Sequence, residues 1–167
     1  CNFSSDRFDK DLDAVIERAK INNVNKFLIV SASLNDFEKI YNIYKSNLKE
    51  AFFSIGTHPH HADEINEEQI KNMRRLVGEH NPSCIGETGL DFFRNLSSHD
   101  EQTYAFQEQI KIAIDFNKPL YLHQRDSHSE FIKIISEYKD YLPKSVVHCF
   151  TGTQSELEDY LDLGFYI

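Results

Sequence analysis

The stretch Cys84-Ile85-Gly86-Glu87-Thr88-Gly89-Leu90-Asp91-Phe92 places a carboxylate, Glu87, after a short apolar run and between two glycines. The run from Ser83 to Ile85 predicts a buried strand that ends at Glu87. A charge in that position is costly unless another group pairs with it. Two later apolar runs end in the same way, in His123 and in His148. Because the carboxyl ends of parallel strands meet on one side of a sheet, the three side chains are expected to lie together.

One carboxylate and two imidazoles at matching strand ends are typical of a metal site. The alternative is that each histidine is a hydrogen-bonded core residue, and for a single histidine that alternative is preferable. Three polar groups in equivalent positions favour a metal site with Glu87, His123 and His148 as ligands. These ligands suit zinc, manganese or, with more water, magnesium, so the identity of the ion stays open.

Short apolar runs alternate with segments of helical periodicity along the whole chain. Strands are expected at 26–30, 51–55, 83–87, 120–123 and 145–148, with 1–3 as the tail of a first strand and 165–167 as the start of a seventh. One helix is expected from Asp9 onward. The other helix starts carry polar pairs at capping spacing: Asn35 with Glu38, Asn66 with Gln69, Ser98 with Glu101, Ser127 with Glu130 and Thr153 with Glu156.

This alternation predicts an α/β fold with a parallel sheet wrapped by helices. A doubly wound open sheet and a closed TIM-type (β/α)8 barrel both fit the pattern. A TIM-type barrel usually needs about 250 residues, and this chain has 167. If the fold is a barrel, residues 1–167 are therefore expected to be a single, incomplete domain. It would hold about six strand–helix units and the start of strand seven, truncated at both ends.

The composition restricts the partners and the compartment. The net charge of −9 gives no long-range attraction for nucleic acid, so local cations such as metal ions would have to hold a polyanionic substrate. No apolar run is long enough to span a membrane. The three cysteines are odd in number and lack CxxC spacing, which indicates a reducing compartment, and we expect a cytoplasmic location.

Two histidines follow the expected strand at 51–55. His58 and His60 flank Pro59, which stiffens the loop. An exposed, proline-fixed turn is one interpretation, and metal ligation is the least favoured. Contact with a substrate phosphate is slightly preferred.

For two other polar residues close to the strand ends, Arg125 and Asp91, two interpretations stay open. Arg125 can bind a phosphate through two N–H groups or pair with Asp126 or Asp91, and neither role is preferred. Asp91 can orient a ligand histidine or cap a turn.

Cys149 is expected to point away from the site, because it follows His148 on an alternating strand. His80, His99 and His128 are expected at the surface.

Four motifs together resemble the TatD family of metal-dependent deoxyribonucleases. They are residues 54–60 (Ser-Ile-Gly-Thr-His-Pro-His), 85–92 (Ile-Gly-Glu-Thr-Gly-Leu-Asp-Phe), 122–126 (Leu-His-Gln-Arg-Asp) and 147–152 (Val-His-Cys-Phe-Thr-Gly). The resemblance implies an eight-fold barrel and a hydrolase that cleaves DNA, often as a 3′ to 5′ exonuclease on single strands. It implies that Glu87 bridges two divalent ions and that His123 and His148 complete one site. It also places His58, His60 and Arg125 near the scissile phosphate.

The chain departs from the family pattern at both ends. Asn2 stands where many relatives carry the second histidine of an HxH motif. In lacking this motif, the chain resembles the subgroup that contains TatD itself. The family's last metal-binding aspartate would follow Ile167, so activity is expected of the intact protein. Two other functions stay open: an amidohydrolase-like barrel hydrolase with another substrate, or a catalytically weak protein that binds DNA ends or a partner. The first usually keeps the HxH motif, which counts against it here.

Overall fold

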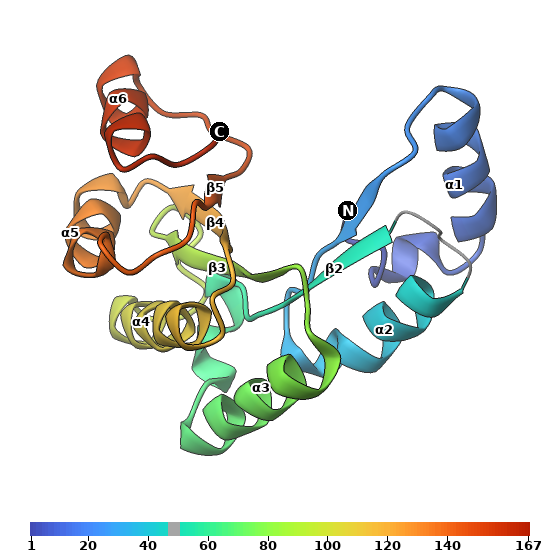
Figure 1. Cartoon of the computed structure of the whole chain (residues 1–167), viewed down its shortest axis with the longest axis horizontal. Helices are drawn as coiled ribbons and strands as arrows, with labels where there is room; N and C mark the ends of the chain where they lie inside the picture. The colour runs from blue at the N-terminus through green and yellow to red at the C-terminus, as the bar shows by residue number, and fades with distance from the viewer. Residues whose placement is uncertain (47–50) are drawn as a thin grey trace.

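A curled parallel sheet forms the centre of the molecule. The structure, a computed structural model, describes residues 1–46 and 51–167. The strands are β1 (Phe27–Ile29), β2 (Ala51–Ile55), β3 (Cys84–Asp91), β4 (Leu120–Arg125) and β5 (Val146–Val147). They are hydrogen-bonded in chain order, and every pair is parallel. The sheet curls into an open half-barrel (Figure 1), which confirms the α/β barrel-type fold.

The helices lie along the outer side of this curled sheet (Figure 1). They are α1 (Leu12–Ile21), α2 (Phe37–Lys45), α3 (Glu67–His80), α4 (His99–Asp115), α5 (His128–Tyr138) and α6 (Gln154–Asp162), with short 3-10 helices η1 (Asp6–Phe8), η2 (Leu34–Asp36) and η3 (Pro59–Glu64). The capping boxes expected at Ser98 and Thr153 are both present. Asn66 also caps α3, since its side chain accepts from two backbone N–H groups.

Two of the expected helix caps are wrong. The pair Asn35–Glu38 does not cap α2, because the side chain of Ser33 accepts from the Asn35 N–H and starts η2 instead. The hydroxyl of Ser127 makes no cap for α5; it donates to the carbonyl oxygen of Leu90, 3.1 Å away. That bond ties the start of α5 to β3, so the residue positions a helix without capping it.

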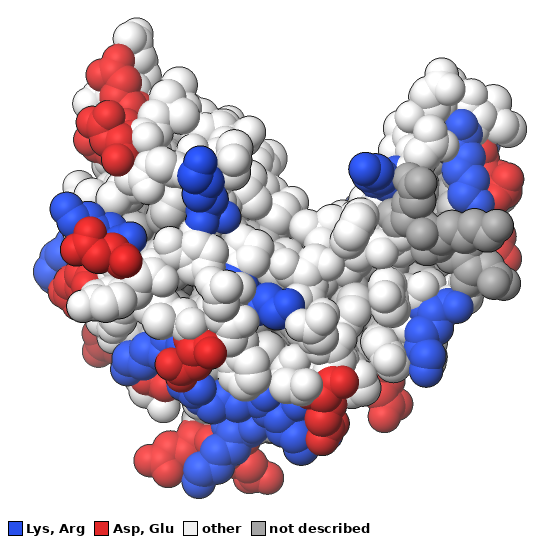
Figure 2. All heavy atoms as spheres, viewed as in Figure 1, with Lys and Arg blue, Asp and Glu red and all other residues white. Residues whose placement is uncertain are grey.

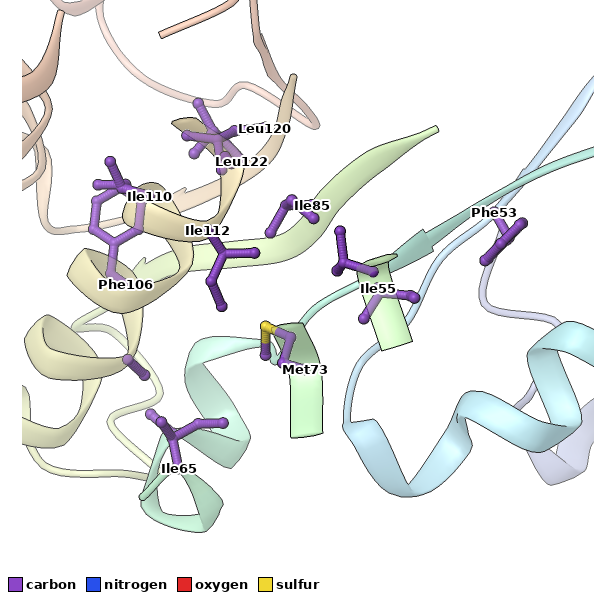
Figure 3. Close-up of a cluster of buried hydrophobic side chains, with 14 of the residues drawn as sticks. Phe53, Ile55, Ile65, Met73, Ile85, Phe106, Ile110, Ile112, Leu120 and Leu122 are labelled. Atoms are coloured by element: carbon purple, nitrogen blue, oxygen red, sulfur yellow. The ribbon is translucent and has the colours of Figure 1, made fainter. Parts of the chain in front are cut away.

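The core lies between the sheet and helices α3 and α4 (Figure 3). Ile55, Ile85 and Leu120 point from three neighbouring strands into this layer, and each is at most 1% exposed. Ile110 of α4 and Met73 of α3 are fully buried against them. Burying one such side chain contributes about 1.5–3 kcal/mol, so this layer fixes the strands that carry the polar residues.

Strand β3 does not end at Glu87, as the sequence pattern suggested, but continues to Asp91. Gly86 pairs with Tyr121 and Thr88 pairs with Leu122, so Glu87 is an extra residue at a register shift. Such bulges commonly redirect a side chain beside a functional site. Gly86, with φ of 140°, makes the close approach to β4 possible, because a Cβ there would collide with the Tyr121 carbonyl oxygen.

The expected strands at the two ends of the sequence are only partly formed. The N–H₃⁺ group of Cys1 donates to Leu28, and the Cys1 carbonyl accepts from Val30, but residues 1–3 form no strand. Near the other end, Tyr166 makes a single bridge with Val146. The described residues therefore hold five strands, whereas six strands and the start of a seventh were expected.

The surface in Figure 2 carries both signs of charge. Lys and Arg lie beside Asp and Glu on this face, which is hollowed between the α1 end and the α6 end. In the part of the chain that the structure describes, no helix has the length and apolar character needed to cross a membrane.

Candidate metal and phosphate site

Three imidazole rings converge on one carboxylate oxygen. Oε1 of Glu87 lies 2.6 Å from Nε2 of His148, 3.0 Å from Nδ1 of His123 and 3.3 Å from Nε2 of His58. The four residues come from the bulge of β3, from β4 and from the segments that follow β2 and β5. The structure thus brings together the three residues expected to bind metal, and it adds His58 to them.

By the distances between ligand atoms alone, the group that could hold a metal ion differs in one residue from the expected set. Ligand atoms of His58, Glu87 and His123 all lie within 4.8 Å of one another. Nδ1 of His58, however, accepts a hydrogen bond from the His60 backbone N–H at 3.1 Å. A neutral His58 then carries its proton on Nε2, which faces Glu87, and a protonated nitrogen is not a metal ligand. His58 is therefore better placed to donate to a carboxylate or phosphate oxygen.

The charge states of these groups fit a divalent cation. Burial would raise the pKa of Glu87, but hydrogen bonds with His123, His148 and His58 outweigh it and hold that pKa below its usual range. Loss of solvent lowers the pKa of His58, although Glu87 opposes this effect. At neutral pH the cluster accordingly contains an ionised carboxylate and a neutral His58. Carboxylate and imidazole donors together suit manganese, zinc or a similar ion.

Asp91 contacts two histidines of the cluster and the turn that follows β3. Its Oδ2 lies 2.8 Å from Nε2 of His60 and 3.2 Å from Nε2 of His123, while Oδ1 accepts from the Arg94 N–H at 2.8 Å. Burial raises its pKa, yet the hydrogen bonds from Arg94, His60 and His123 leave the pKa lowered. An ionised Asp91 that holds Nε2–H of His123 leaves Nδ1 of that ring free to bind a metal.

A cavity of about 310 Å³ opens in front of this cluster. It is lined by His58, His60, Glu87, Asp91, Arg94, His123, Gln124, Arg125, His148, Cys149 and Thr151. Arg125 lies 3.9 Å from Asp126, a weak ion pair at an exposed position, and its side chain remains at the cavity. The structure therefore brings all the expected substrate-binding residues to the same cavity as the expected metal ligands.

Two buried glutamines of α4 hold the loops that carry these residues, and the sequence pattern did not reveal them. Gln109 accepts from the Thr57 N–H at 2.8 Å and donates to the Thr57 carbonyl at 3.0 Å. Gln102 makes the same pair of bonds with Asp91, at 2.8 and 3.2 Å. The sequence does show two amide side chains, seven residues apart, on the apolar face of this helix, and that pattern could have indicated their role.

Cys149 was expected to point away from the site, but it lines the cavity. Strand pairing ends at Val147, and Cys149 adopts a φ of 51°. The alternation of a strand does not extend to a residue in that conformation. The alternation holds two residues earlier, because Val147 is buried in the core.

Of the three histidines expected at the surface, His99 is exposed as expected, whereas His80 and His128 are partly buried against neighbours. His128 places Nδ1 2.9 Å from the Tyr160 hydroxyl and Nε2 2.8 Å from Asp159. The ring of His99 stacks on Phe92 with centroids 3.7 Å apart, and His80 packs against aromatic rings of α2. None of the three lines the cavity.

Solved structures of similar shape cover nearly the whole chain. YJJV, a TatD homologue from Escherichia coli K12, matches 99% of this chain and 64% of its own with a TM-score of 0.90 at 23% identity, which is evidence of fold alone. A TatD family hydrolase from Entamoeba histolytica matches 99% of this chain and 61% of its own with a TM-score of 0.88 at 27% identity.

Curated relatives are more similar in sequence. The protein named 3′-5′ ssDNA/RNA exonuclease TatD from Cronobacter sakazakii is 38% identical over 166 residues, which are 99% of this chain and 63% of that protein. The protein of the same name from Pantoea ananatis is 36% identical over 99% of this chain and 64% of its own length. The chain thus spans slightly less than two thirds of these relatives. The family model described as TatD related DNase matches residues 1–167, and the chain therefore belongs to that family.

Proposed function

We propose that the protein is a metal-dependent nuclease that removes nucleotides from the 3′ end of single-stranded DNA. The observation that carries this proposal is the convergence of three imidazoles on Glu87 inside a cavity that also holds Arg94 and Arg125. Membership of the TatD related DNase family supports it, as do the names of the relatives. Because the chain covers 63–64% of those relatives, the proposal concerns the activity of the whole protein.

We propose Glu87, His123 and His148 as the metal ligands. Asp91 supports this assignment because it holds the far nitrogen of His123, which fixes the ring and its tautomer. A divalent ion in such a site supplies a water of lowered pKa and neutralises charge on the phosphoryl group. The nuclease assay described below compares magnesium, manganese and zinc as the active ion.

His58, His60 and Arg125 are the proposed contacts for the scissile phosphate. His58 presents Nε2–H toward the cluster, because its other nitrogen accepts from the backbone. His60 is held by Asp91 at 2.8 Å and lies at the cavity wall. The guanidinium of Arg125 offers two parallel N–H donors, which match the geometry of a phosphate.

Of the alternatives, another barrel hydrolase and a non-catalytic DNA-binding protein have less support. Similarity to a DNase family covers the whole chain, and a pKa of Glu87 held below its usual range supports metal binding over a packing role. We also propose a cytoplasmic location, since Cys1, Cys84 and Cys149 are all free thiols.

The test uses the purified protein and single-stranded DNA labelled at its 5′ end, with RNA of the same sequence in parallel. Reactions contain magnesium, manganese, zinc or a chelator. We expect metal-dependent shortening from the 3′ end, lost in Glu87→Gln and kept in the control Glu79→Gln, which alters an exposed ion pair. A folded protein that shortens no strand with any metal, or a fully active Glu87→Gln, would contradict the proposal.

The ligand assignment has its own test by calorimetric titration with Mn²⁺. We expect His123→Ala to weaken binding at least tenfold, because it removes a ligand. We expect His58→Ala to bind Mn²⁺ as the unchanged protein does while losing activity. Weakened Mn²⁺ binding in His58→Ala would make His58 a ligand and refute the donor role.

A further inference from the structure

The loop after β3 exposes two large apolar side chains beside the cavity. Phe93 is 60% exposed and Leu96 is 67% exposed. Isolated exposed apolar residues are normal, so exposure alone carries no function. Phe93 differs by its position, because it directly precedes Arg94, which lines the cavity.

The ring of Phe93 is also in contact with the cavity wall. The guanidinium of Arg125 lies 4.6 Å from the centre of the ring, in cation–π geometry. Arg125 thus contacts Phe93 and lines the cavity at the same time. Since Phe93 remains largely exposed, part of its ring surface is available to a flat ligand.

The overall charge of the protein makes such a contact useful. With a net charge of −9, the protein cannot collect a nucleic acid strand by long-range attraction. Proteins that bind single strands without sequence preference combine local cations with aromatic rings on which bases stack. Arg94, Arg125 and Phe93 supply both components within one small surface.

We propose that Phe93, backed by Arg125, is a stacking platform for a nucleobase of the substrate next to the bound phosphate. This inference rests on the proposed nuclease function and names the part of the substrate that the cavity rim recognises. A stacked base must be unpaired, so the platform favours single strands over duplexes. Phe93 is a specificity residue and takes no part in the chemistry at the phosphate.

The test compares Phe93→Ala, Phe93→Tyr and the control Leu96→Ala, which removes a similarly exposed side chain from the same loop. Two substrates are used: a single-stranded oligonucleotide, and the same strand with abasic residues at its 3′ end, which keeps the phosphates but offers no ring to stack. Loss of stacking in Phe93→Ala is expected to lower kcat/KM for the normal strand about tenfold or more, mainly through KM.

For the abasic strand, Phe93→Ala is expected to equal the unchanged protein. Phe93→Tyr should restore activity on the normal strand, and Leu96→Ala should be unaltered. An equal loss on both strands would assign Phe93 a structural role, and no loss on the normal strand would refute the platform. Either result leaves metal-dependent cleavage by the unchanged protein intact, so it is distinct from failure of the nuclease function.

A binding measurement tests the platform even without cleavage. A strand with 2-aminopurine at the 3′ end is mixed with Glu87→Gln, with and without Phe93→Ala. Stacking on Phe93 predicts a change in 2-aminopurine fluorescence that the second substitution removes. The same fluorescence change in both proteins would overturn the inference.

Discussion

Gln109 offers the sharpest test of how the scaffold positions the site. Its amide is fully buried and forms both backbone bonds of Thr57, the residue before His58. The substitution Gln109→Leu keeps the size of the side chain but leaves the Thr57 N–H and C=O without these partners. Each buried group that loses its hydrogen bond costs about 1–3 kcal/mol. We therefore expect the free energy of unfolding to fall by about 2–4 kcal/mol, after allowance for the added apolar surface.

The assay is urea unfolding followed by circular dichroism, with Gln154→Leu as the control, because Gln154 is exposed on α6. Activity on single-stranded DNA is measured in parallel. A loosened Thr57 lets His58 move, and a displacement of about 1 Å at a reacting centre can cost about a hundredfold in rate. If Gln109→Leu unfolds at the same urea concentration as the unchanged protein and keeps its rate, the bonds to Thr57 contribute neither stability nor positioning.

Three further changes test other parts of the structure. Thr88 is fully buried, and its hydroxyl has no hydrogen-bond partner among the described residues, so Thr88→Val should raise the free energy of unfolding by about 1 kcal/mol, measured in urea. Burial raises the pKa of the Cys84 thiol to about 12, so at pH 8 a thiol reagent should modify the exposed Cys1 and Cys149 quickly and Cys84 only after unfolding. Because the unfolded thiol ionises near pH 9, stability should also fall as the pH rises from 9 toward 12, and Cys84→Ala should make that slope shallower. Gly86→Ala should destabilise the protein by about 2–3 kcal/mol and abolish activity, because a methyl group at φ of 140° collides with β4; a stable, active variant would contradict the tight pairing.

The sequence predicted the fold class and the proximity of the proposed metal ligands, because both depend on local patterns. Alternating apolar runs and helical segments specify a parallel sheet, and its strands bring Glu87, His123 and His148 together. The capping boxes at Ser98 and Thr153 were equally readable, because a cap needs only residues three apart.

Features that depend on tertiary contacts were not predictable in this way. The bulge at Glu87 arises from the register between β3 and β4, which no short stretch of sequence specifies. The tautomer of His58 depends on the backbone N–H of His60, and the roles of Gln102 and Gln109 depend on loops far along the chain. The contact between α5 and α6 through His128 and Asp159 could not be predicted for the same reason.

Glu87 and its neighbouring histidines are proposed to form a metal centre. The most direct measurement is a crystal structure of the protein with Mn²⁺, with anomalous diffraction to locate the ions. We expect an anomalous peak within bonding distance of Glu87 and His123, and its absence in crystals of Glu87→Gln. A well-ordered crystal in Mn²⁺ with no peak at Glu87, or with the same peak after Glu87→Gln, would contradict this proposal.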